Sequence, residues 1–178
     1  AFERGERRNS DLRKANTNEM SIMPQGLTDV EKNEIAEYFS SMPFRQWVRV
    51  VEAEEVPQVH ADGGLMVPIP DAPLMPLGQR IIEVPEHPER MEIMRDPRTG
   101  FISYVPVGSL AKGEEIVTTG AGKTIQCGVC HGPELRGVAF IPGIAGRTAS
   151  YMMRQLWDVK QGTRVSPLMA PVVANLSA

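Results

Sequence analysis

Cysteine is scarce in this sequence: the 178 residues contain only two, Cys127 and Cys130. Two cysteines cannot form a disulfide framework, and a bridge across two residues would close almost no loop.

Apolar runs are also short, and none approaches the roughly 18 residues that a membrane-spanning helix needs. Residues 1–14 are charged and lack an apolar core, so we expect no signal peptide here. Either the protein is cytosolic or its signal has been removed.

The charge balance gives little reason to expect a charged partner. The formal net charge is −3, which favours neither nucleic acid nor an anionic membrane surface. Hydrophobic residues make up 42% and charged residues 23% of the chain, which is typical of a globular, soluble protein. The sequence contains ten methionines, which is many, and most of them are expected to pack in the hydrophobic core.

The first segment, residues 1–42, reads as turns over 1–27 followed by a helix. Thr28 is expected to cap this helix, and Glu31 completes a capping box. Pro43 ends the helix. An apolar stripe at helical spacing follows the cap and consists of Ile35, Tyr38 and Phe39.

Residues 43–107 have a different composition, because ten of the fifteen prolines lie there. Prolines at this density prevent long helices and confine strands to sheet edges. Short strands are predicted at 47–51, 80–84 and 101–105, with a turn at 96–100 before the last. The segment keeps its aliphatic residues, so we interpret it as an ordered, loop-rich connector.

Residues 108–178 read as a compact module. Ser109 is expected to cap a helix that runs to about Thr118. A loop rich in glycine and proline follows over 132–146, and a second helix is predicted at 148–161, ended by Gly162. No further helix is predicted before the end of the sequence.

The pattern Cys-x-x-Cys-His, formed by Cys127, Cys130 and His131, is typical of covalent c-type haem attachment. Each thiol can add to one haem vinyl group to give a thioether. The two intervening residues place the sulfurs over neighbouring pyrrole edges. The next residue then projects its imidazole toward the iron.

Three alternatives compete with haem attachment. A structural zinc site usually needs four ligands, and the other histidines, His60 and His87, lie in the connector. A thioredoxin-like dithiol would sit in a βαβ context, which the surrounding sequence does not show. A chance pattern is the third alternative.

Met169 is the candidate for a second iron ligand, since methionine and histidine commonly hold haem iron in electron carriers. It lies outside any predicted helix, between Pro167 and Pro171, which suits a rigid ligand segment. Met152 and Met153 fall within a predicted helix and are expected to be core residues. Met94 is a more remote candidate.

Four stretches of the module resemble class I c-type cytochromes, and most of all the second domain of the periplasmic dihaem c-type cytochromes of bacteria. They are GSLAKGEEIVTTG, CGVCHGPELRG, IPGIAGRTASYMMRQLWDVKQGTR and LMAPVVANL. The resemblance implies a mainly α fold, in which a small helical domain surrounds covalent haem c. The proline-rich connector would add short strands to it.

The front of the chain resembles the same family. AFERGERR is similar to LWDVKQGTR, and EMSIMPQGL aligns with LMAPVVANL, which places Met20 opposite Met169 and Leu27 opposite Leu176. Residues 1–42 then correspond to the back half of a first cytochrome domain, and 108–178 to a second domain without its last helix. The sequence is therefore expected to be part of a dihaem protein, with Met20 as ligand of a second haem. Head-to-tail self-association is the alternative explanation.

The resemblance also implies roles for residues around the haem. Pro142, eleven residues after His131, matches the proline whose carbonyl accepts the other N–H of the proximal histidine. Four further side chains are candidates for pairing with the haem propionates, and they are Arg147, Tyr151, Arg154 and Arg164.

The expected iron ligands, His131 and Met169, indicate an electron carrier, because a six-coordinate His/Met iron has no open position for substrate. Its partners would be redox proteins or a membrane respiratory or photosynthetic complex, and its location the periplasm, where the family is matured. The alternative is a haem subunit of a redox enzyme whose sixth ligand is displaceable, with solvent, His60 or His87 replacing Met169.

Overall fold

The computed structural model describes residue 3, residues 17–43 and residues 45–177. The chain divides into two compact units, one of Ala1–Arg45 with Asp158–Pro171 and one of Gln46–Trp157 with Val172–Ala178. Among the described residues, no helix is both long and apolar enough to cross a bilayer. The resemblance of AFERGERR to LWDVKQGTR lies outside the described residues, as does most of the predicted turn region.

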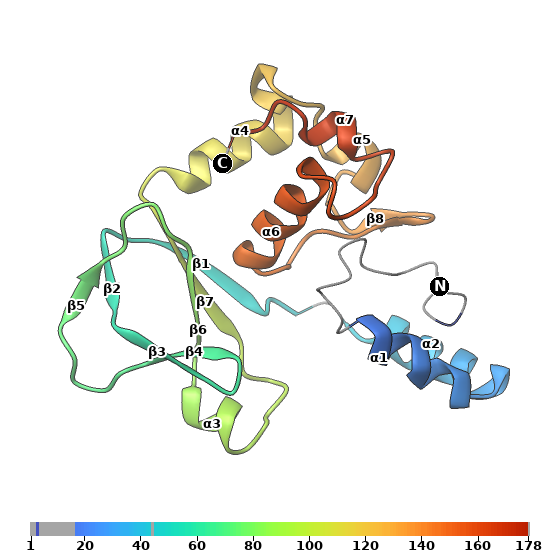
Figure 1. The fold of residues 1–178 in the computed structure, drawn as a ribbon, viewed down its shortest axis with the longest axis horizontal. Coiled ribbons are helices and arrows are strands. Elements are labelled where there is room, and N and C mark those ends of the chain that lie inside the picture. Colours follow the sequence, from blue (N-terminus) through green and yellow to red (C-terminus); the bar gives the residue numbers. More distant parts are fainter. Residues whose placement is uncertain (1–2, 4–16, 44, 178) are drawn as a thin grey trace. The chain divides into compact units, whose positions relative to one another are not determined.

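In the first unit, residues 17–26 are helical rather than a series of turns, so this part of the prediction was wrong. Helix α1 spans Thr17–Ile22, the 3-10 helix η1 spans Met23–Gly26, and helix α2 spans Asp29–Ser41 (Figure 1). The two helices before Leu27 follow one another directly, which short-range sequence patterns did not indicate.

The capping box at the start of α2 is confirmed. The Glu31 N–H donates to Thr28 Oγ1 at 3.3 Å, and the Thr28 N–H donates to Glu31 Oε2 at 2.7 Å. These donors from Thr28 hold the pKa of the Glu31 carboxyl below its usual value. The apolar stripe of α2 stays exposed in the described structure, with Tyr38 and Phe39 in edge-to-face contact at 5.3 Å.

The second unit contains a sheet region, which we define as residues 46–107. Its seven strands are β1 Val48–Glu52, β2 Glu55–Pro57, β3 Val59–Asp62, β4 Leu65–Pro68, β5 Leu74–Pro76, β6 Ile82–Pro85 and β7 Phe101–Val105. A short helix, α3, spans Pro88–Glu92. Strand β7 lies between β1, to which it is parallel, and β6, to which it is antiparallel. The pairs β2–β5 and β3–β4 form antiparallel ribbons.

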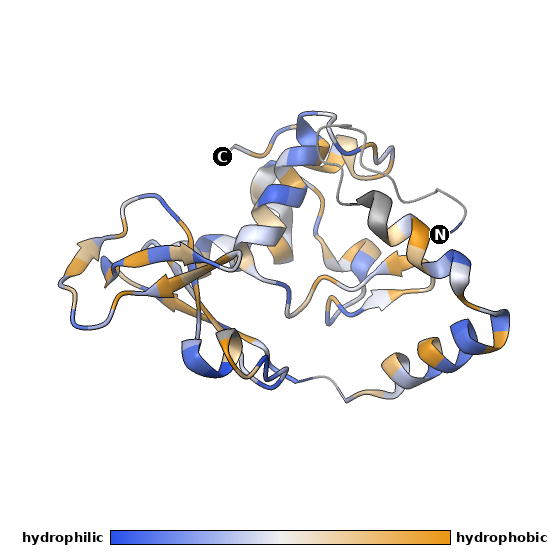
Figure 2. Cartoon of the chain, turned by 60° about the horizontal axis from the view of Figure 1, so that its bottom comes forward, coloured by the Kyte–Doolittle hydropathy of each residue, from blue (hydrophilic) through white to orange (hydrophobic). Residues whose placement is uncertain are grey.

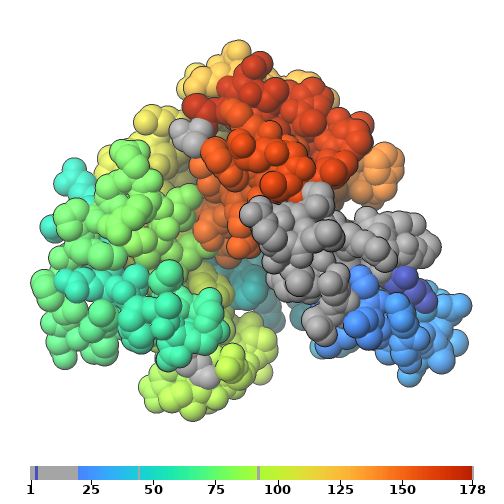
Figure 3. Space-filling view, in the orientation of Figure 1, coloured from blue at the N-terminus to red at the C-terminus, as the bar shows by residue number. Residues whose placement is uncertain are grey.

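The sheet region has its own hydrophobic core. Val56, Leu77, Ile82 and Val84 form one buried cluster. The apolar residues of these strands appear orange in Figure 2, and in Figure 3 the atoms of this region, cyan to yellow-green, pack closely. Strands β2, β4, β5 and β6 each end at a proline, which cannot donate to a ladder.

The motif region, which we define as residues 108–157, follows β7. Its elements are α4 Ser109–Thr119, η2 Gly120–Gly122, α5 Gly128–His131, β8 Gly137–Val138, β9 Ile141–Pro142 and the start of α6 Ala149–Lys160. Helix α7, Ala170–Val173, lies beyond α6 in the chain.

The prediction that Ser109 caps α4 was wrong, because Gly108 holds that position and Glu52 Oε1 accepts from the Leu110 N–H at 2.7 Å. Gly162 does follow the end of α6, with φ +73° and its N–H donating to Val159 O.

The mainly α fold class is corrected by the structure. Within the described ranges the chain is only 37% helical, with 20% strand in several small sheets. Of the seven strands in the sheet region, three coincide within two residues with the predicted strands, and four were not predicted. The helical prediction fits the motif region but not the connector, whose strands each contain five residues or fewer.

Glu83 on β6 joins the sheet region to α6. Its carboxylate accepts from the Ser103 hydroxyl at 2.5 Å and from the Ser150 N–H at 3.3 Å, and it also accepts from the Ser150 hydroxyl. An acidic side chain at this position satisfies an N-terminal N–H of α6 and complements the helix dipole. The motif region is thereby anchored to the sheet at the start of α6.

Candidate cofactor site

The Cys-x-x-Cys-His motif forms one helical turn held by the end of α4. The Cys127 N–H donates to Val117 O at 3.0 Å, and the His131 N–H donates to Cys127 O at 3.0 Å. Cys127 stands at the N-cap of α5, and His131 is its last residue. Residues three and four apart are neighbours on a helix, so Cys127 is next to both Cys130 and His131 on this turn.

Both cysteines are free thiols. Cys130 is exposed and Cys127 is half-buried. Burial raises the pKa of the Cys127 thiol, with a smaller contribution from the neighbouring Cys130. A raised pKa is the opposite of the lowered pKa that activates a reactive redox cysteine.

His131 is buried, with 8% of its surface exposed, and its orientation is set from one side. Its Nδ1 lies 2.7 Å from Pro142 O on β9. A carbonyl oxygen can only accept, so this contact requires a proton on Nδ1, and Nε2 is then the nitrogen able to ligate a metal. The structure thus brings together two residues that the sequence placed eleven positions apart.

Two glycines let the β8–β9 hairpin fold back closely enough for this contact. Gly137 has φ +94°, which other residues rarely adopt. A Cβ on Gly143 would lie 2.5 Å from Arg136 O. Backbone therefore passes against backbone directly next to Pro142, and a side chain at either glycine would push the strands apart.

Met169 is half-buried and lies in a turn immediately before α7. Its N–H donates to Ser166 O at 3.1 Å. Met169 belongs to the first unit and His131 to the second, so their pairing as ligands of one iron stays a prediction.

Met20 lies in α1, where it is 45% exposed. The aligned segments around Met20 and Met169 share one backbone hydrogen bond. The Leu27 N–H donates to Pro24 O at 3.3 Å, and the Leu176 N–H donates to Val173 O at 3.1 Å. These four residues occupy the same positions in the two segments, so the turn after each methionine closes in the same way.

The residues expected near haem propionates lie on or beside α6. Arg147 and Arg154 are exposed, and Tyr151 is 40% exposed. The Arg164 N–H donates to Asp158 O at 3.0 Å, in the turn after α6. Their roles toward propionates stay predictions.

The connector histidines are not part of a metal cluster. His60 is exposed on β3, and His87 is exposed at the N-cap of α3. Across the described ranges, no three His, Cys, Asp or Glu side chains are grouped so that they could hold a metal ion.

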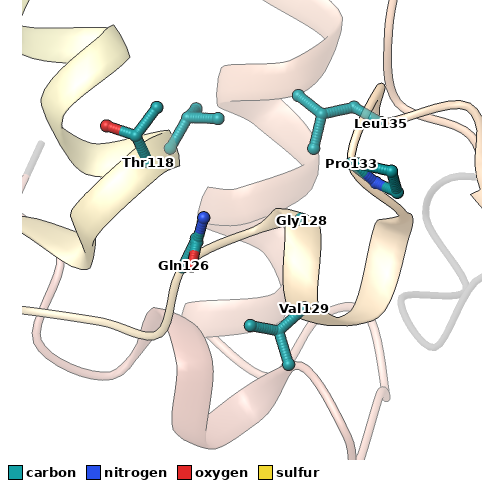
Figure 4. A pocket seen from close by; sticks show the side chains of 7 residues that line it. Thr118, Gln126, Gly128, Val129, Pro133 and Leu135 are labelled. Carbon is teal, nitrogen blue, oxygen red and sulfur yellow. The ribbon is translucent and has the colours of Figure 1, made fainter.

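A pocket of about 360 Å³ lies beside the motif. Thr118 on α4 and Leu135 after α5 face each other across it (Figure 4). Its other lining residues are Val117, Gln126, Gly128, Val129 and Pro133. None of these residues is a cysteine, histidine or methionine, and we assign the pocket no part in metal ligation.

Two polar side chains near the site were missed by sequence reasoning. The Thr124 hydroxyl, three residues before the motif, donates to Val172 O at 2.5 Å. Glu83 holds the start of α6. These bonds link residues 48 and 67 positions apart, and no local pattern signals them.

The motif region fits a large apolar group such as haem. Between residues 108 and 157 no hydrophobic side chain is buried. Its exposed large apolar residues are Leu110, Ile125, Val129, Val138, Phe140, Tyr151, Met153 and Trp157. Two free thiols and an oriented imidazole on one helical turn, in a region with exposed large apolar side chains, suit a covalently attached haem.

Three curated proteins are similar to part of this chain. The thiosulfate dehydrogenase electron acceptor of Stutzerimonas stutzeri is 38% identical over 71 residues, which cover 38% of this chain and 33% of that protein. Cytochrome c4 of Azotobacter vinelandii is 36% identical over 59 residues, 33% of this chain and 28% of that protein. Cytochrome c4 of Pseudomonas aeruginosa is 33% identical over 69 residues, 38% of this chain and 34% of that protein.

The chain thus matches only about a third of the length of each curated relative. No family model matches the sequence, and no solved structure matches it. The three relatives nevertheless confirm the resemblance on which the sequence analysis rests. Over the matched stretch, the chain is related to the class I c-type cytochromes.

Proposed function

We propose that this protein carries a covalently attached haem c and transfers single electrons between redox partner proteins. The observation that carries the proposal is the motif turn, where Cys127, Cys130 and His131 lie on one short helix and His131 Nδ1 lies 2.7 Å from Pro142 O. The kinship with cytochromes c supports the coarser statement, electron transport by a haem protein.

The two thiols would hold the haem covalently. Cys127 and Cys130 would each be joined to one haem vinyl group by a C–S bond, with the thiol hydrogen going to the neighbouring vinyl carbon. The addition has no leaving group and needs no oxidant.

The iron would be held by His131 through Nε2 and by Met169 through its sulfur. Haem iron held in this way supplies a centre that gains and loses one electron. The bond from His131 Nδ1–H to Pro142 O fixes the tautomer and raises the donor strength of the imidazole. Met169 completes the ligation and leaves no position for substrate, so the protein is proposed to be an electron carrier rather than an enzyme.

Four side chains, Arg147, Tyr151, Arg154 and Arg164, are proposed to pair with the propionates. For Met20 we propose the matching role toward a second haem, whose attachment motif is not in this sequence. The shared turn after Met20 and Met169 supports this assignment.

The partners proposed are a redox enzyme as donor and a redox protein or membrane complex as acceptor. The name of the Stutzerimonas stutzeri relative, an electron acceptor of a dehydrogenase, supports such a donor. We also propose a periplasmic location and, where copies meet, head-to-tail association.

A redox titration with absorption spectra tests the proposal, using protein produced with the c-type maturation system. We expect a one-electron transition and, in the oxidised protein, the weak far-red band of methionine-ligated iron. Met169→Ala should abolish this band and lower the potential, whereas Met153→Ala should keep both near the wild-type values. An unchanged band in Met169→Ala would reject Met169 as ligand, and an open-site spectrum in the wild type would favour the enzyme alternative.

A further inference from the structure

We propose that the Thr124 hydroxyl is a tether that ties the segment carrying Met169 to the cysteine motif, and so controls how readily Met169 leaves the iron. The inference rests on the proposed haem ligation. It makes Thr124 a positioning residue, because its hydroxyl acts on Met169 through the backbone of α7.

The donor end of the tether is fixed by the turn after α4. The Thr124 N–H donates to Gly120 O at 3.0 Å, and the Lys123 N–H donates to the same oxygen at 2.9 Å. Gly120 is buried with φ +77°, a conformation that favours glycine. Three residues after Thr124, the Cys127 N–H is bound to Val117 O. The Thr124 hydroxyl and the first thioether position are therefore held by the same end of α4.

The acceptor end lies in α7. The Thr124 hydroxyl donates to Val172 O at 2.5 Å in a part-buried setting. The last carbonyls of a helix have no partners within it, and α7 has only four residues. The Thr124 hydroxyl thus gives the Val172 carbonyl a hydrogen-bond donor that α7 itself cannot supply. The next residue, Val173, is 1% exposed, so the acceptor is anchored on its C-terminal side as well.

Met169 is connected to this acceptor without a flexible linker. Ser166 O accepts from the Met169 N–H at 3.1 Å and from the Ala170 N–H at 2.9 Å. Helix α7 begins at Ala170, so residues 166–173 form one continuous hydrogen-bonded stretch. Only Ala170 and Pro171 separate Met169 from Val172. A displacement of the Val172 carbonyl is therefore passed to the Met169 backbone.

An imidazole titration measures how readily Met169 leaves the iron, because imidazole binds the iron only when methionine has dissociated. The apparent affinity for imidazole is proportional to the fraction of molecules with methionine dissociated. Removing one net hydrogen bond that favours the ligated state should raise this fraction, and the imidazole affinity with it, by about 2- to 12-fold.

The experiment compares three variants of the haem-loaded full chain by imidazole titration and by the far-red methionine band. Thr124→Val keeps the β-branched shape without the hydroxyl, and Thr124→Ser keeps the hydroxyl. Thr118→Val removes a hydroxyl that donates within its own helix, to Glu114 O, and serves as the control. We expect Thr124→Val to bind imidazole about 2- to 12-fold more tightly with a weaker band. Thr124→Ser and Thr118→Val should remain within about twofold of the wild type, because both keep the tether.

Three results would overturn the proposal: wild-type imidazole affinity in Thr124→Val, an equal gain in Thr124→Ser, or an equal gain in Thr118→Val. If Thr124→Val does not yield holo-protein, Thr124→Ala is titrated against the same criteria. Failure of the proposed function looks different, because the wild type itself would then lack the methionine band or covalent haem.

Discussion

In the sheet region the buried hydrophobic residues are Val48, Val56, Val67, Leu77, Ile82, Val84 and Val105, whereas between residues 108 and 157 none is buried. Both stretches lie in the second unit and both form regular elements. The sheet region is stabilised by its own side chains, through the hydrophobic effect. The motif region has turns and helix caps that order its backbone, but eight of its large apolar side chains are exposed and the others are at most half-buried. The haem that we propose to be attached at Cys127 and Cys130 would supply the missing apolar surface of this region.

The largest effect is expected when the attachment is removed. In the double variant Cys127→Ala/Cys130→Ala, amide hydrogen exchange in α4 and α6 should accelerate at least about tenfold, because these helices lose the apolar partner that covers them. Amides of β6 and β7 should change by less than about twofold, since their core is intact. Mass-detected exchange of the variant and the haem-loaded wild type provides the measurement. Equal loss in both regions would contradict the distinction between them.

The converse experiment weakens the sheet region. Leu77 is fully buried, so Leu77→Ala should lower the free energy of unfolding by about 2–5 kcal/mol. Leu74 is 57% exposed, and Leu74→Ala should change it by no more than about 0.5 kcal/mol. Urea unfolding followed by circular dichroism gives both values. The native haem spectrum should not change, and a changed spectrum in Leu77→Ala would show that the two regions are not separable.

A smaller effect is expected where the motif region depends on close backbone approach. Gly143→Ala would place a Cβ 2.5 Å from Arg136 O, and we expect it to destabilise the holo-protein by about 1–3 kcal/mol. Gly113 lies inside α4 with open space around it, so Gly113→Ala should stabilise by about 0.5–1 kcal/mol. Thermal unfolding compares the two. The same sign for both substitutions would show that the hairpin adapts and that the Pro142 contact does not need it.

The smallest effect is expected at the join between the regions. Glu83→Gln removes the negative charge of the carboxylate that accepts hydrogen bonds from Ser103 and Ser150. We expect it to lower the free energy of unfolding by about 1 kcal/mol. Glu54 is exposed, and Glu54→Gln should stay within about 0.5 kcal/mol of the wild type. Denaturant unfolding monitored at the haem and by circular dichroism should show transitions that separate further in Glu83→Gln. Coincident transitions in this variant would mean that Glu83 does not couple the regions.

The sequence predicted the parts of the fold that depend on neighbouring residues. The capping box of Thr28 and Glu31, helices α4 and α6 and strands β1, β6 and β7 follow from local patterns. Strands β2 to β5 were missed because proline, which ends three of them, disfavours strands in a local pattern. Tertiary pairing overrides that preference here, and the fold class was wrong for this reason.

The candidate site divides in the same way. Cys127, Cys130 and His131 are adjacent in sequence, and the resemblance named Pro142, so their placement could be anticipated. The Glu52 cap on α4, the bond between Glu83 and Ser150 and the Thr124 bond join residues 48 to 67 positions apart, and they depend on the finished fold. The cap assigned to Ser109 failed because the partner from β1 was not visible in the local sequence.

The central claim is that Cys127 and Cys130 hold haem covalently, and the intact mass of the denatured protein tests it most directly. With the maturation system present, this chain should carry the mass of one haem bound through two thioethers, and Cys127→Ala/Cys130→Ala should carry none. A wild-type chain with the mass of its polypeptide alone would contradict the account, as would haem that dissociates on denaturation.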